Sequence, residues 1–250
     1  MTENFYNGEM RSDCGNYMQK LVIKAFYPSS ENMNSALAEA DKIKNLYVSI
    51  KISAEYFDTK IEIFYAEGQQ NAAETIFKIF IEFLGFSVYS MEDVSLPELV
   101  NHLLSLRKKT ISVAESFTSG RVSSAIVSVP GASAHFQEGI VSYSNLSKKH
   151  RLGVTDETLY NYGAVSAECA AEMVRGLLDT DECDVALSTT GIAGPKSDNT
   201  NKPVGLCYFG VGVKGSIKTY EMFLEGNRNF ITETGVRACL FYAVKTLKYM

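Results

Sequence analysis

The stretch Thr110-Ile111-Ser112-Val113-Ala114-Glu115-Ser116-Phe117-Thr118-Ser119-Gly120 decides the fold of the longer part of the chain. Residues 110–114 are apolar or small and predict a buried strand. Residues 115–120 are mostly small and predict a turn, and the apolar spacing of residues 121–129 predicts a helix. A buried strand that turns directly into a helix is the building unit of α/β domains.

The same alternation continues to the end of the chain. We predict strands at residues 140–143, 184–189, 204–213 and 217–224, and helices after Ser166 and over residues 231–247. This pattern predicts a three-layer α/β/α domain with a mixed sheet and helices on both faces. Residues 210–215 also fit G-x-G-x-x-G, but a strand follows them where a dinucleotide site needs a helix, so we predict a hairpin.

The first part of the chain has a different pattern. Residues 1–18 are polar and aperiodic and predict a flexible tail. Residues 19–95 predict the order strand, helix, strand, strand, helix, strand, which is a small α+β domain of ferredoxin-like type. Ser95 and Glu98 form a capping box at the start of the next helix. We therefore predict a domain boundary at residue 95 and a second domain over residues 96–250.

Charge and hydropathy exclude several kinds of partner. The chain has 250 residues, with 24 Lys and Arg against 29 Asp and Glu, which gives a net charge of −5. Residues 1–95 hold 8 basic and 14 acidic residues, so the acidity lies in the first part. Because phosphate contacts supply most nucleic-acid affinity, we expect no nucleic-acid partner. The sequence has neither an apolar run of about 18 residues nor a signal peptide, so we expect a cytoplasmic protein without membrane contact.

The cysteines and histidines predict no metal site. The five cysteines include no C-x-x-C pair, and the three histidines do not have the spacing of zinc ligands. We expect reduced thiols, some of them buried, and neither a metal nor a cofactor.

Two stretches hold residues suited to chemistry. The turn at residues 115–120 precedes a helix, so its backbone N–H groups can bind an anion, or its residues can simply cap the helix; the sequence favours neither. Ser133, Tyr143 and Lys148 fall within 16 residues, and a serine near a desolvated lysine can form a nucleophile–base pair. The alternative for Lys148 is an ordinary surface charge, and spacing alone favours that alternative.

Eight short motifs follow one another along the second part of the chain. They are Ala114-Glu115-Ser116, Pro130-Gly131-Ala132-Ser133, Tyr143-Ser144-Asn145 with Lys148, Leu152-Gly153-Val154, Gly163-Ala164-Val165-Ser166, Thr190-Gly191-Ile192-Ala193-Gly194-Pro195, Lys202-Pro203-Val204-Gly205 and Gly226-Asn227-Arg228. Together they resemble the C-terminal domain of the CinA (competence/damage-inducible) family, which is a nicotinamide mononucleotide deamidase module. Eight ordered motifs over roughly 150 residues make chance a poor explanation.

The resemblance to this family implies an activity and a set of site residues. The implied reaction is hydrolysis of the carboxamide of nicotinamide mononucleotide to nicotinate mononucleotide and ammonia, a step of pyridine nucleotide salvage. Ser133 takes the position of the nucleophile, Lys148 that of the general base and Tyr143 that of a further catalytic residue. The implied substrate-binding residues are Ser116, Thr118, Thr190, Gly191 and Arg228. This chemistry requires no metal and no cofactor, and we expect a homodimer.

Residues 20–95 are similar to the middle, KH-like domain of full-length CinA proteins by element order and position. The G-x-x-G loop with which KH domains bind nucleic acid is missing from residues 1–95, so we expect no RNA binding. The molybdopterin-binding-like N-terminal domain of full-length CinA has no room in this chain, and we do not expect its activity here.

Four departures from the family pattern leave a second function open. Phe117 occupies the position of a cysteine, Ser119 that of a glycine, Ala132 that of a serine and Asn227 that of an aspartate. The alternative to an active amidase is therefore a catalytically weakened nucleotide-binding or regulatory protein.

Overall fold

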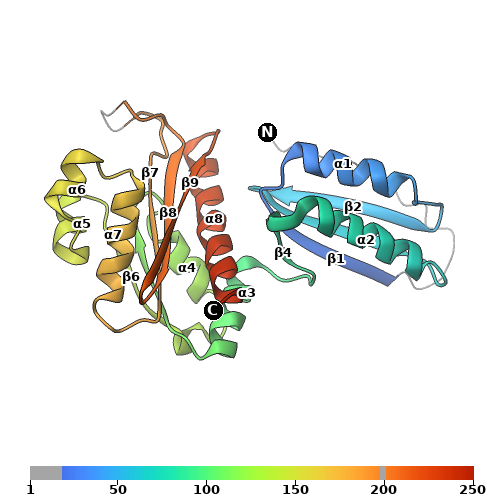
Figure 1. Ribbon diagram of the computed structural model, residues 1–250, viewed down its shortest axis with the longest axis horizontal. Coiled ribbons are helices and arrows are strands. Elements are labelled where there is room, and N and C mark those ends of the chain that lie inside the picture. Colours follow the sequence, from blue (N-terminus) through green and yellow to red (C-terminus); the bar gives the residue numbers. More distant parts are fainter. Residues whose placement is uncertain (1–18, 198–200) are drawn as a thin grey trace. The chain divides into compact units, whose positions relative to one another are not determined.

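A computed structural model describes residues 19–197 and 201–250 of the chain (Figure 1). By its internal contacts the chain divides into two units, Met1–Val94 and Ser95–Met250. The predicted tail of residues 1–18 lies outside the described residues. Among the described helices, none is both long and apolar enough to span a membrane.

The first unit has the predicted order of strands and helices. Its elements are β1 (Gln19–Phe26), α1 (Ser30–Asp41), β2 (Val48–Glu55), β3 (Asp58–Tyr65), α2 (Gln70–Leu84) and β4 (Val88–Ser90), with a 3-10 turn at Gly85–Ser87. The strands form an antiparallel sheet in the order β2-β3-β1-β4. This order, with both helices on one face (Figure 1), is the ferredoxin-like arrangement that the sequence predicts.

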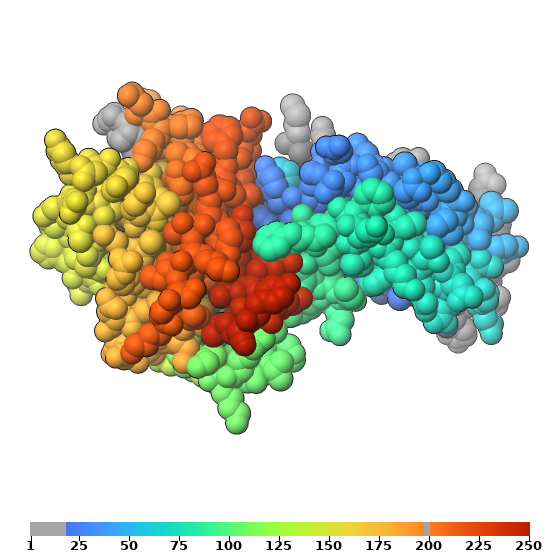
Figure 2. Space-filling model, in the orientation of Figure 1, coloured from blue at the N-terminus to red at the C-terminus, as the bar shows by residue number. Residues whose placement is uncertain are grey.

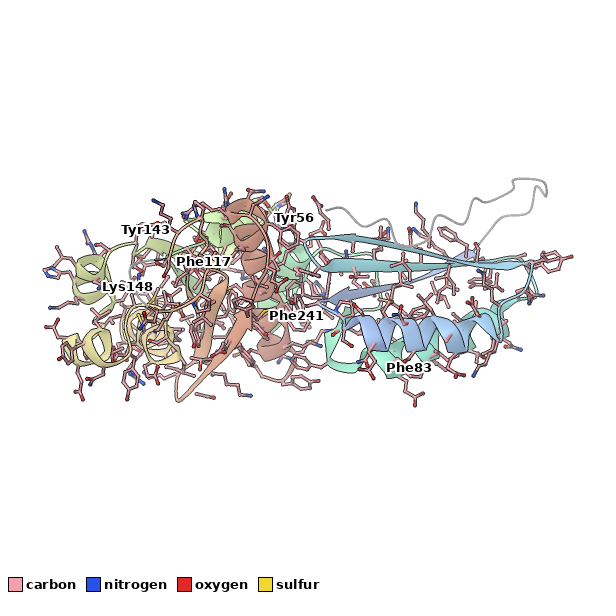
Figure 3. The ribbon with its side chains drawn as sticks, turned by 90° about the horizontal axis from the view of Figure 1, so that it is seen from above. Tyr56, Phe83, Phe117, Tyr143, Lys148 and Phe241 are labelled. Atoms are coloured by element: carbon pink, nitrogen blue, oxygen red, sulfur yellow. The ribbon has the colours of Figure 1, made fainter. Side chains whose placement is uncertain are left out.

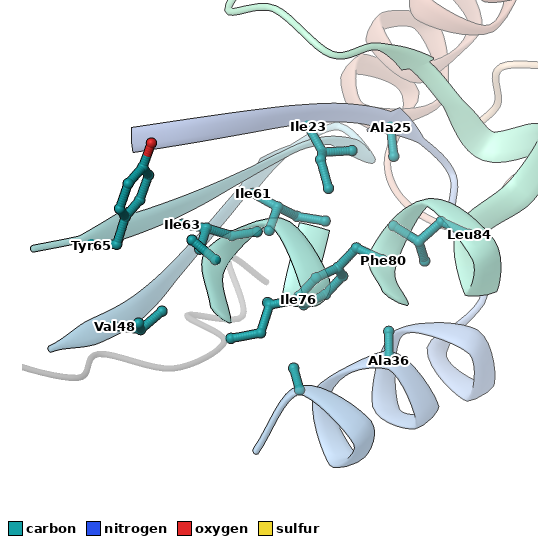
Figure 4. Close-up of a cluster of buried hydrophobic side chains, with 12 residues drawn as sticks. Ile23, Ala25, Ala36, Val48, Ile61, Ile63, Tyr65, Ile76, Phe80 and Leu84 are labelled. Carbon is teal, nitrogen blue, oxygen red and sulfur yellow. The ribbon is translucent and has the colours of Figure 1, made fainter. Parts of the chain in front are cut away.

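The core of the first unit lies between the sheet and the two helices. Because side chains alternate across a strand, Ile23 of β1 and Ile61 and Ile63 of β3 point to the same face. Ile76 and Phe80, one helical turn apart on α2, belong to the same cluster (Figure 4). All five side chains are fully buried. The apolar periodicity of the strands therefore determines which face the helices cover.

The second unit is the predicted α/β domain with a mixed sheet. Its elements are α3 (Leu96–Arg107), β5 (Ile111–Glu115), α4 (Arg121–Val127), a 3-10 turn (Ala132–Ala134), β6 (Phe136–Val141), α5 (Asn145–Leu152), α6 (Asp156–Asn161), α7 (Ala167–Leu178), β7 (Val185–Gly191), β8 (Leu206–Val213), β9 (Ser216–Phe223) and α8 (Arg228–Lys248). The strand order is β6-β5-β7-β8-β9. β5 is parallel to both of its neighbours, and β8 and β9 extend the sheet with antiparallel pairing.

Helices cover both faces of this sheet. The Phe209 ring of β8 lies 6.1 Å from that of Phe117 and 6.0 Å from that of Tyr242 on α8, measured between centroids. The next residue, Gly210, faces the other way, where an added Cβ would lie 2.7 Å from Val174 of α7. α7 and α8 therefore belong to different layers, as predicted, and the missing side chain at Gly210 allows α7 to approach the sheet.

Two short helices of the second unit have no counterpart in the sequence prediction. α5 and α6 follow β6 and lie at the surface, in the yellow segment of Figure 2. β6 begins earlier than predicted, at Phe136. The glycines of residues 210–215 lie in the predicted hairpin, in which Val213 pairs with Ser216.

Candidate active site

The parallel strands of the second unit bring three chain segments to one edge of the sheet. Glu115, the last residue of β5, pairs with Val141 at the end of β6 and with Thr189 near the end of β7. Ser116 and Ser142 follow directly after β5 and β6 and therefore lie at the same edge. In α/β proteins the carboxyl ends of the strands are the usual place for a ligand site.

Lys148 reaches this edge from α5. The Ser144 side chain caps that helix by accepting the Ser147 N–H at 3.1 Å. Lys148 Nζ donates hydrogen bonds to Ser116 Oγ at 2.9 Å and to the Ser142 carbonyl at 2.7 Å. Lys148 is only 1% exposed and Ser116 only 8%. A buried amine is thus in direct contact with a serine hydroxyl.

The surroundings of Lys148 favour its neutral form. Burial lowers the pKa of the Lys148 ammonium from its ordinary value of 10.5, although the neighbouring Cys169 thiol opposes this shift. No carboxylate within residues 19–197 and 201–250 forms an ion pair with Lys148. A neutral amine can accept a proton, and a general base beside a hydroxyl must do so.

The structure does not bring Ser133 to Lys148. Ser133 is exposed in the turn Ala132–Ala134, at the amino end of β6, whereas Ser116 lies at the carboxyl end of the parallel strand β5. A strand rises about 3.3 Å per residue, so the two end residues of β6 are about 17 Å apart. Within the chain, Lys148 therefore contacts Ser116 rather than Ser133.

Glu115 occupies the anion-binding position of the turn at residues 115–120. Its carboxylate accepts the backbone N–H groups of Gly120, Val122 and Ser123 at 2.9, 3.1 and 2.8 Å, and the Ser123 hydroxyl at 2.6 Å. These N–H groups belong to the amino end of α4, where a negative charge is favourable. Of the two alternatives that the sequence left open, the structure has the capped helix, and the capping anion is the chain's own carboxylate.

Thr118 and Thr189 lie fully buried next to Glu115. Thr118 Oγ1 donates to Glu115 Oε2 at 2.7 Å and lies 2.7 Å from Thr189 Oγ1. Thr189 Oγ1 also accepts the Ser116 N–H at 3.4 Å. The family motif implied that Thr118 binds substrate, but its hydroxyl is used inside the protein. Sequence reasoning missed Thr189 and the role of Glu115. The adjacency of Glu115 to Ser116 in one motif was a signal for Glu115, but Thr189 had none.

Three further residues from the motifs surround the end of β7. Thr190 Oγ1 donates to the Ala164 carbonyl at 2.6 Å. At Gly191 an added Cβ would lie 2.9 Å from Cys207 Sγ on β8, so the close approach of β7 and β8 requires a glycine there. Arg228, exposed at the start of α8, donates from Nη1 to the Gly194 carbonyl at 2.7 Å. Because a guanidinium has five N–H donors, Arg228 can hold this loop and still contact an anion.

Tyr143 lies on the loop between β6 and α5, and 62% of its surface is exposed. Its neighbour Ser142 provides the carbonyl that binds Lys148. Figure 3 labels Phe117, Tyr143 and Lys148, which come from three different segments of the second unit. The position of Tyr143 suits contact with a molecule that enters from the surface, rather than contact with the core.

The departures from the family pattern leave the pair of Ser116 and Lys148 intact. The Phe117 ring is buried against α8, where a Cβ added to Gly235 would lie 2.5 Å from it. Asn227 caps α8 by accepting the Phe230 N–H at 2.9 Å, which an aspartate would also do. The changes at Phe117 and Asn227 therefore lie in core packing and at a helix cap rather than at Ser116 or Lys148.

Two cavities of about 340 and 520 Å³ lie at the opposite edge of the sheet. Their walls share Asp181, Val213 and Lys214, and Lys214 is paired with Asp181 at 2.7 Å. In the part of the chain that the structure describes, no three His, Cys, Asp or Glu side chains come together as metal ligands. The buried contact of Lys148 with Ser116 at the carboxyl edge is the candidate catalytic pair.

Comparison with known sequences places the second unit in a protein family. The profile of a family described as the CinA C-terminal domain matches residues 93–247. The chain is 40% identical over 181 residues to a "putative competence-damage inducible protein" of Halothermothrix orenii, covering 72% of this chain and 44% of that protein. It is 47% identical over 146 residues to the protein of the same name from Clostridium beijerinckii, covering 58% and 36%. The chain thus spans less than half the length of these relatives.

Comparison with solved structures gives the same result for the second unit. A competence-damaged protein (CinA) superfamily protein from Klebsiella pneumoniae matches with a TM-score of 0.60 and 29% identity, over 62% of this chain and 97% of that chain. A competence/damage inducible protein from Agrobacterium tumefaciens matches with a TM-score of 0.58 and 32% identity, over 64% and 99%.

Proposed function

The chain belongs to the CinA C-terminal domain family, and we propose that it hydrolyses the carboxamide of nicotinamide mononucleotide with Ser116 as the nucleophile and Lys148 as the general base. The products are nicotinate mononucleotide and ammonia. The substrate and the reaction rest on the resemblance of the ordered motifs to this family. The choice of nucleophile rests on geometry and replaces Ser133.

The observation that supports this proposal is the contact between Lys148 Nζ and Ser116 Oγ at 2.9 Å. An amide is a poor electrophile, so its hydrolysis needs a nucleophile stronger than water and a base that can remove the nucleophile's proton. Burial lowers the pKa of Lys148, which increases the fraction of neutral amine at physiological pH. The second hydrogen bond, to the Ser142 carbonyl, holds the amine in position.

We propose the following steps for these two residues. Lys148 accepts the Ser116 proton while Ser116 Oγ forms a bond to the carboxamide carbon. The tetrahedral intermediate collapses, the C–N bond breaks, and the Lys148 ammonium returns the proton to the leaving group, which departs as ammonia. A water molecule then attacks the resulting ester with Lys148 again as the base, which releases the nicotinate carboxylate and restores the Ser116 hydroxyl.

The phosphate of the substrate needs a donor other than the amino end of α4. The Glu115 carboxylate already accepts the N–H groups there, and it would repel a second anion. We propose that Arg228 contacts the phosphate, because its guanidinium is exposed beside the loop that contains Gly194.

The test is ammonia release from nicotinamide mononucleotide by the wild type and by two serine variants. We expect Ser116→Ala to reduce kcat about 10³-fold or more, because the nucleophile is lost. Ser133→Ala is the matched control, and we expect kcat within about two-fold of wild type, because an exposed residue at the other edge contributes little.

Two results would contradict the proposal. Normal turnover by Ser116→Ala with loss of turnover by Ser133→Ala would return the nucleophile to Ser133. Tight binding of the mononucleotide by the wild type without ammonia release would instead support the alternative, a nucleotide-binding or regulatory protein.

A further inference from the structure

Lys202 joins two parts of the chain that no strand pairing connects. Its Nζ donates to the Tyr162 carbonyl at 2.6 Å and also to the Val165 carbonyl. These acceptors precede it by 40 and 37 residues and lie in the connection between α6 and α7. Tyr162 is the C-cap residue of α6, and the carbonyls at the end of a helix favour a cation.

The two carbonyls between these acceptors are also bound by side chains. Ser166 Oγ donates to the Gly163 carbonyl at 2.9 Å, and Thr190 Oγ1 donates to the Ala164 carbonyl at 2.6 Å. Residues 162–165 form no helix or strand, yet each of their four carbonyls accepts a side-chain hydrogen bond. Side chains, rather than backbone pairing, therefore fix the conformation of this segment.

The fixed segment leads directly to the surroundings of Lys148. Val165 and Ser166 are buried, and the Ser166 side chain caps α7 by accepting the Cys169 N–H at 3.1 Å. Burial raises the pKa of the Cys169 thiol to about 11, and the charges of Lys148 and Lys202 oppose this shift. The carbonyl that Lys202 holds and the thiol beside Lys148 are thus about one helical turn apart along the chain.

We propose that Lys202 is a positioning residue that holds the first turn of α7 against Lys148, so that this base stays enclosed. The inference rests on the proposed function only in taking Lys148 as the base, and it holds whichever serine attacks the substrate. Lys202 acts through the backbone of residues 162–165 and not by transferring a proton itself. It also gives one shared role to three of the ordered motifs, which contain Val165, Thr190 and Lys202.

The enclosure of Lys148 determines how easily it holds a proton. Burial lowers its pKa, and among the described residues the titratable group of another element that acts on it is the Cys169 thiol of α7. The Glu115 carboxylate of β5 is occupied by donors of its own turn, and Lys149, the next residue of α5, is paired with Asp156 at 2.6 Å. Water admitted beside Lys148 therefore raises its pKa toward the ordinary value of 10.5.

The experiment compares Lys202→Met with a matched control, Lys214→Met. The first variant keeps an apolar stem and removes the ammonium, whereas Lys214 is an exposed lysine between β8 and β9 that is paired with Asp181 at the other edge. The assay follows formation of nicotinate mononucleotide against pH. We expect Lys202→Met to raise the midpoint of the kcat/KM profile by about one pH unit, which is a loss of about 10-fold near neutral pH, with KM within about three-fold. We expect Lys214→Met to match the wild type.

A truncated variant tests whether the ammonium itself is required. Lys202→Ala removes the atoms from Cγ to Nζ, which propylammonium can replace. We expect propylammonium to restore kcat/KM of Lys202→Ala to within about three-fold of wild type and to leave the wild type unchanged. If Lys202→Met does not fold, Lys202→Ala purified with propylammonium and then freed of it gives the same comparison.

A second readout does not depend on the proposed substrate. Acetic anhydride modifies accessible amines, and Lys148 is only 1% exposed in the folded protein. Peptide mass spectrometry measures the rate at which Lys148 is acetylated under native conditions. We expect Lys202→Met to raise this rate about 10-fold, because the enclosure opens more often, and Lys214→Met to leave it unchanged. Faster acetylation in Lys202→Met, with no ammonia release by the wild type, would reject the proposed substrate and support the inference.

Three outcomes would overturn the inference. One is a Lys202→Met variant whose pH midpoint and Lys148 acetylation rate both match the wild type. Another is a loss of kcat/KM at an unchanged midpoint and an unchanged acetylation rate, which would indicate a role away from Lys148. The last is a folded Lys202→Ala variant that propylammonium does not restore, because then the ammonium is not what holds the segment.

Discussion

The two edges of the five-stranded sheet each hold a lysine, and the two lysines have opposite surroundings. At the amino edge Lys109 lies 2.8 Å from the Asp184 carboxylate, and these side chains are 38% and 37% exposed. At the carboxyl edge Lys148 is buried, and its hydrogen-bond partners are a hydroxyl and a carbonyl. The Lys109 ammonium is paired with the Asp184 carboxylate and is partly exposed to solvent. The Lys148 ammonium is destabilised by burial, which lowers its pKa.

The difference shows that one sheet holds an ion-paired lysine at one edge and, at the other, a buried lysine that has no carboxylate partner among the described residues. A half-exposed ion pair contributes little energy. A buried lysine without a carboxylate favours the neutral form and costs stability whenever it is protonated. Perturbed groups of this kind concentrate at functional sites, and here the perturbed lysine lies at the edge where α/β proteins bind ligands.

The largest difference between the two edges is expected in kcat when Lys148 and Lys109 are each replaced. We expect Lys148→Met to reduce kcat for ammonia release about 10³-fold or more, because the general base is lost. We expect Lys109→Met to leave kcat within about two-fold of wild type. In the wild type, kcat/KM should rise with pH as Lys148 loses its proton, with a midpoint below 10.5, the ordinary pKa of lysine. Rate profiles against pH for the three proteins check these outcomes.

The stability of the same variants gives an independent check. Between the lowered pKa of Lys148 in the folded state and 10.5 in the unfolded state, the unfolded chain binds the extra proton. The unfolding free energy of the wild type relative to Lys148→Met should therefore increase with pH across this range. A difference that stays constant with pH, in urea unfolding of both proteins, would show that burial does not perturb Lys148.

A smaller effect, on stability, is expected from changes in the packing around Phe117 near the carboxyl edge. A glycine inside a helix normally gains about 1 kcal/mol of stability when replaced by alanine. Gly235→Ala should instead lose about 1–2 kcal/mol, because its Cβ would lie 2.5 Å from the Phe117 ring. Urea unfolding of Gly235→Ala, Phe117→Cys and the double variant measures the coupling. Additive losses would mean that the ring and the helix do not contact each other as described.

The smallest effect is expected at the amino edge. Asp184 accepts Lys109 Nζ at 2.8 Å and the Thr110 N–H at 2.9 Å. Desolvation raises the pKa of the Asp184 carboxyl, but the hydrogen bonds from Lys109 and Thr110 outweigh it, and the pKa falls below 3.8. We expect Asp184→Asn to lose about 0.5–1 kcal/mol of unfolding free energy with kcat unchanged.

The pH dependence of the stability difference between the wild type and Asp184→Asn checks this prediction. The advantage of the wild type over Asp184→Asn should be complete above pH 3.8 and disappear as the pH falls through the lowered pKa of Asp184. Chemical unfolding at neutral and acidic pH measures it. An advantage that persists in acid would mean that the Asp184 charge is not what stabilises this edge.

Sequence reasoning predicts the fold well because periodicity and capping are local. The order of elements in the first unit, the mixed sheet of the second, and the hairpin at residues 210–215 all follow from local pattern. α5 escapes prediction because residues 145–152 are mostly polar. That helix depends on the Ser144 cap and on packing of Leu152 in the core, which a short window of sequence does not reveal.

The candidate site is harder to predict, because the serine that is nearer to Lys148 along the chain is not the serine that contacts it in space. Ser133 is much nearer to Lys148 in sequence than Ser116 is, yet β6 lies between Ser133 and Lys148. Ser116 and Lys148 meet only because β5 and β6 run parallel and end at one edge. The family motifs place Ser116 in the site, but its role depends on which hydroxyl the amine contacts. Thr189 has no local signal at all, because its partners come from other segments.

The way in which Glu115 binds its own turn has a consequence for the order of folding. Its contacts with Thr118, Gly120, Val122 and Ser123 span only 3 to 8 residues along the chain. Contacts of such short range close small loops at little entropic cost. The contact of Lys148 with Ser116 spans 32 residues, and that of Thr118 with Thr189 spans 71. We expect the turn that holds Ser116 to form early, and Lys148 to reach it only when the sheet is complete, so that an incompletely folded chain has Ser116 without the Lys148 amine beside it.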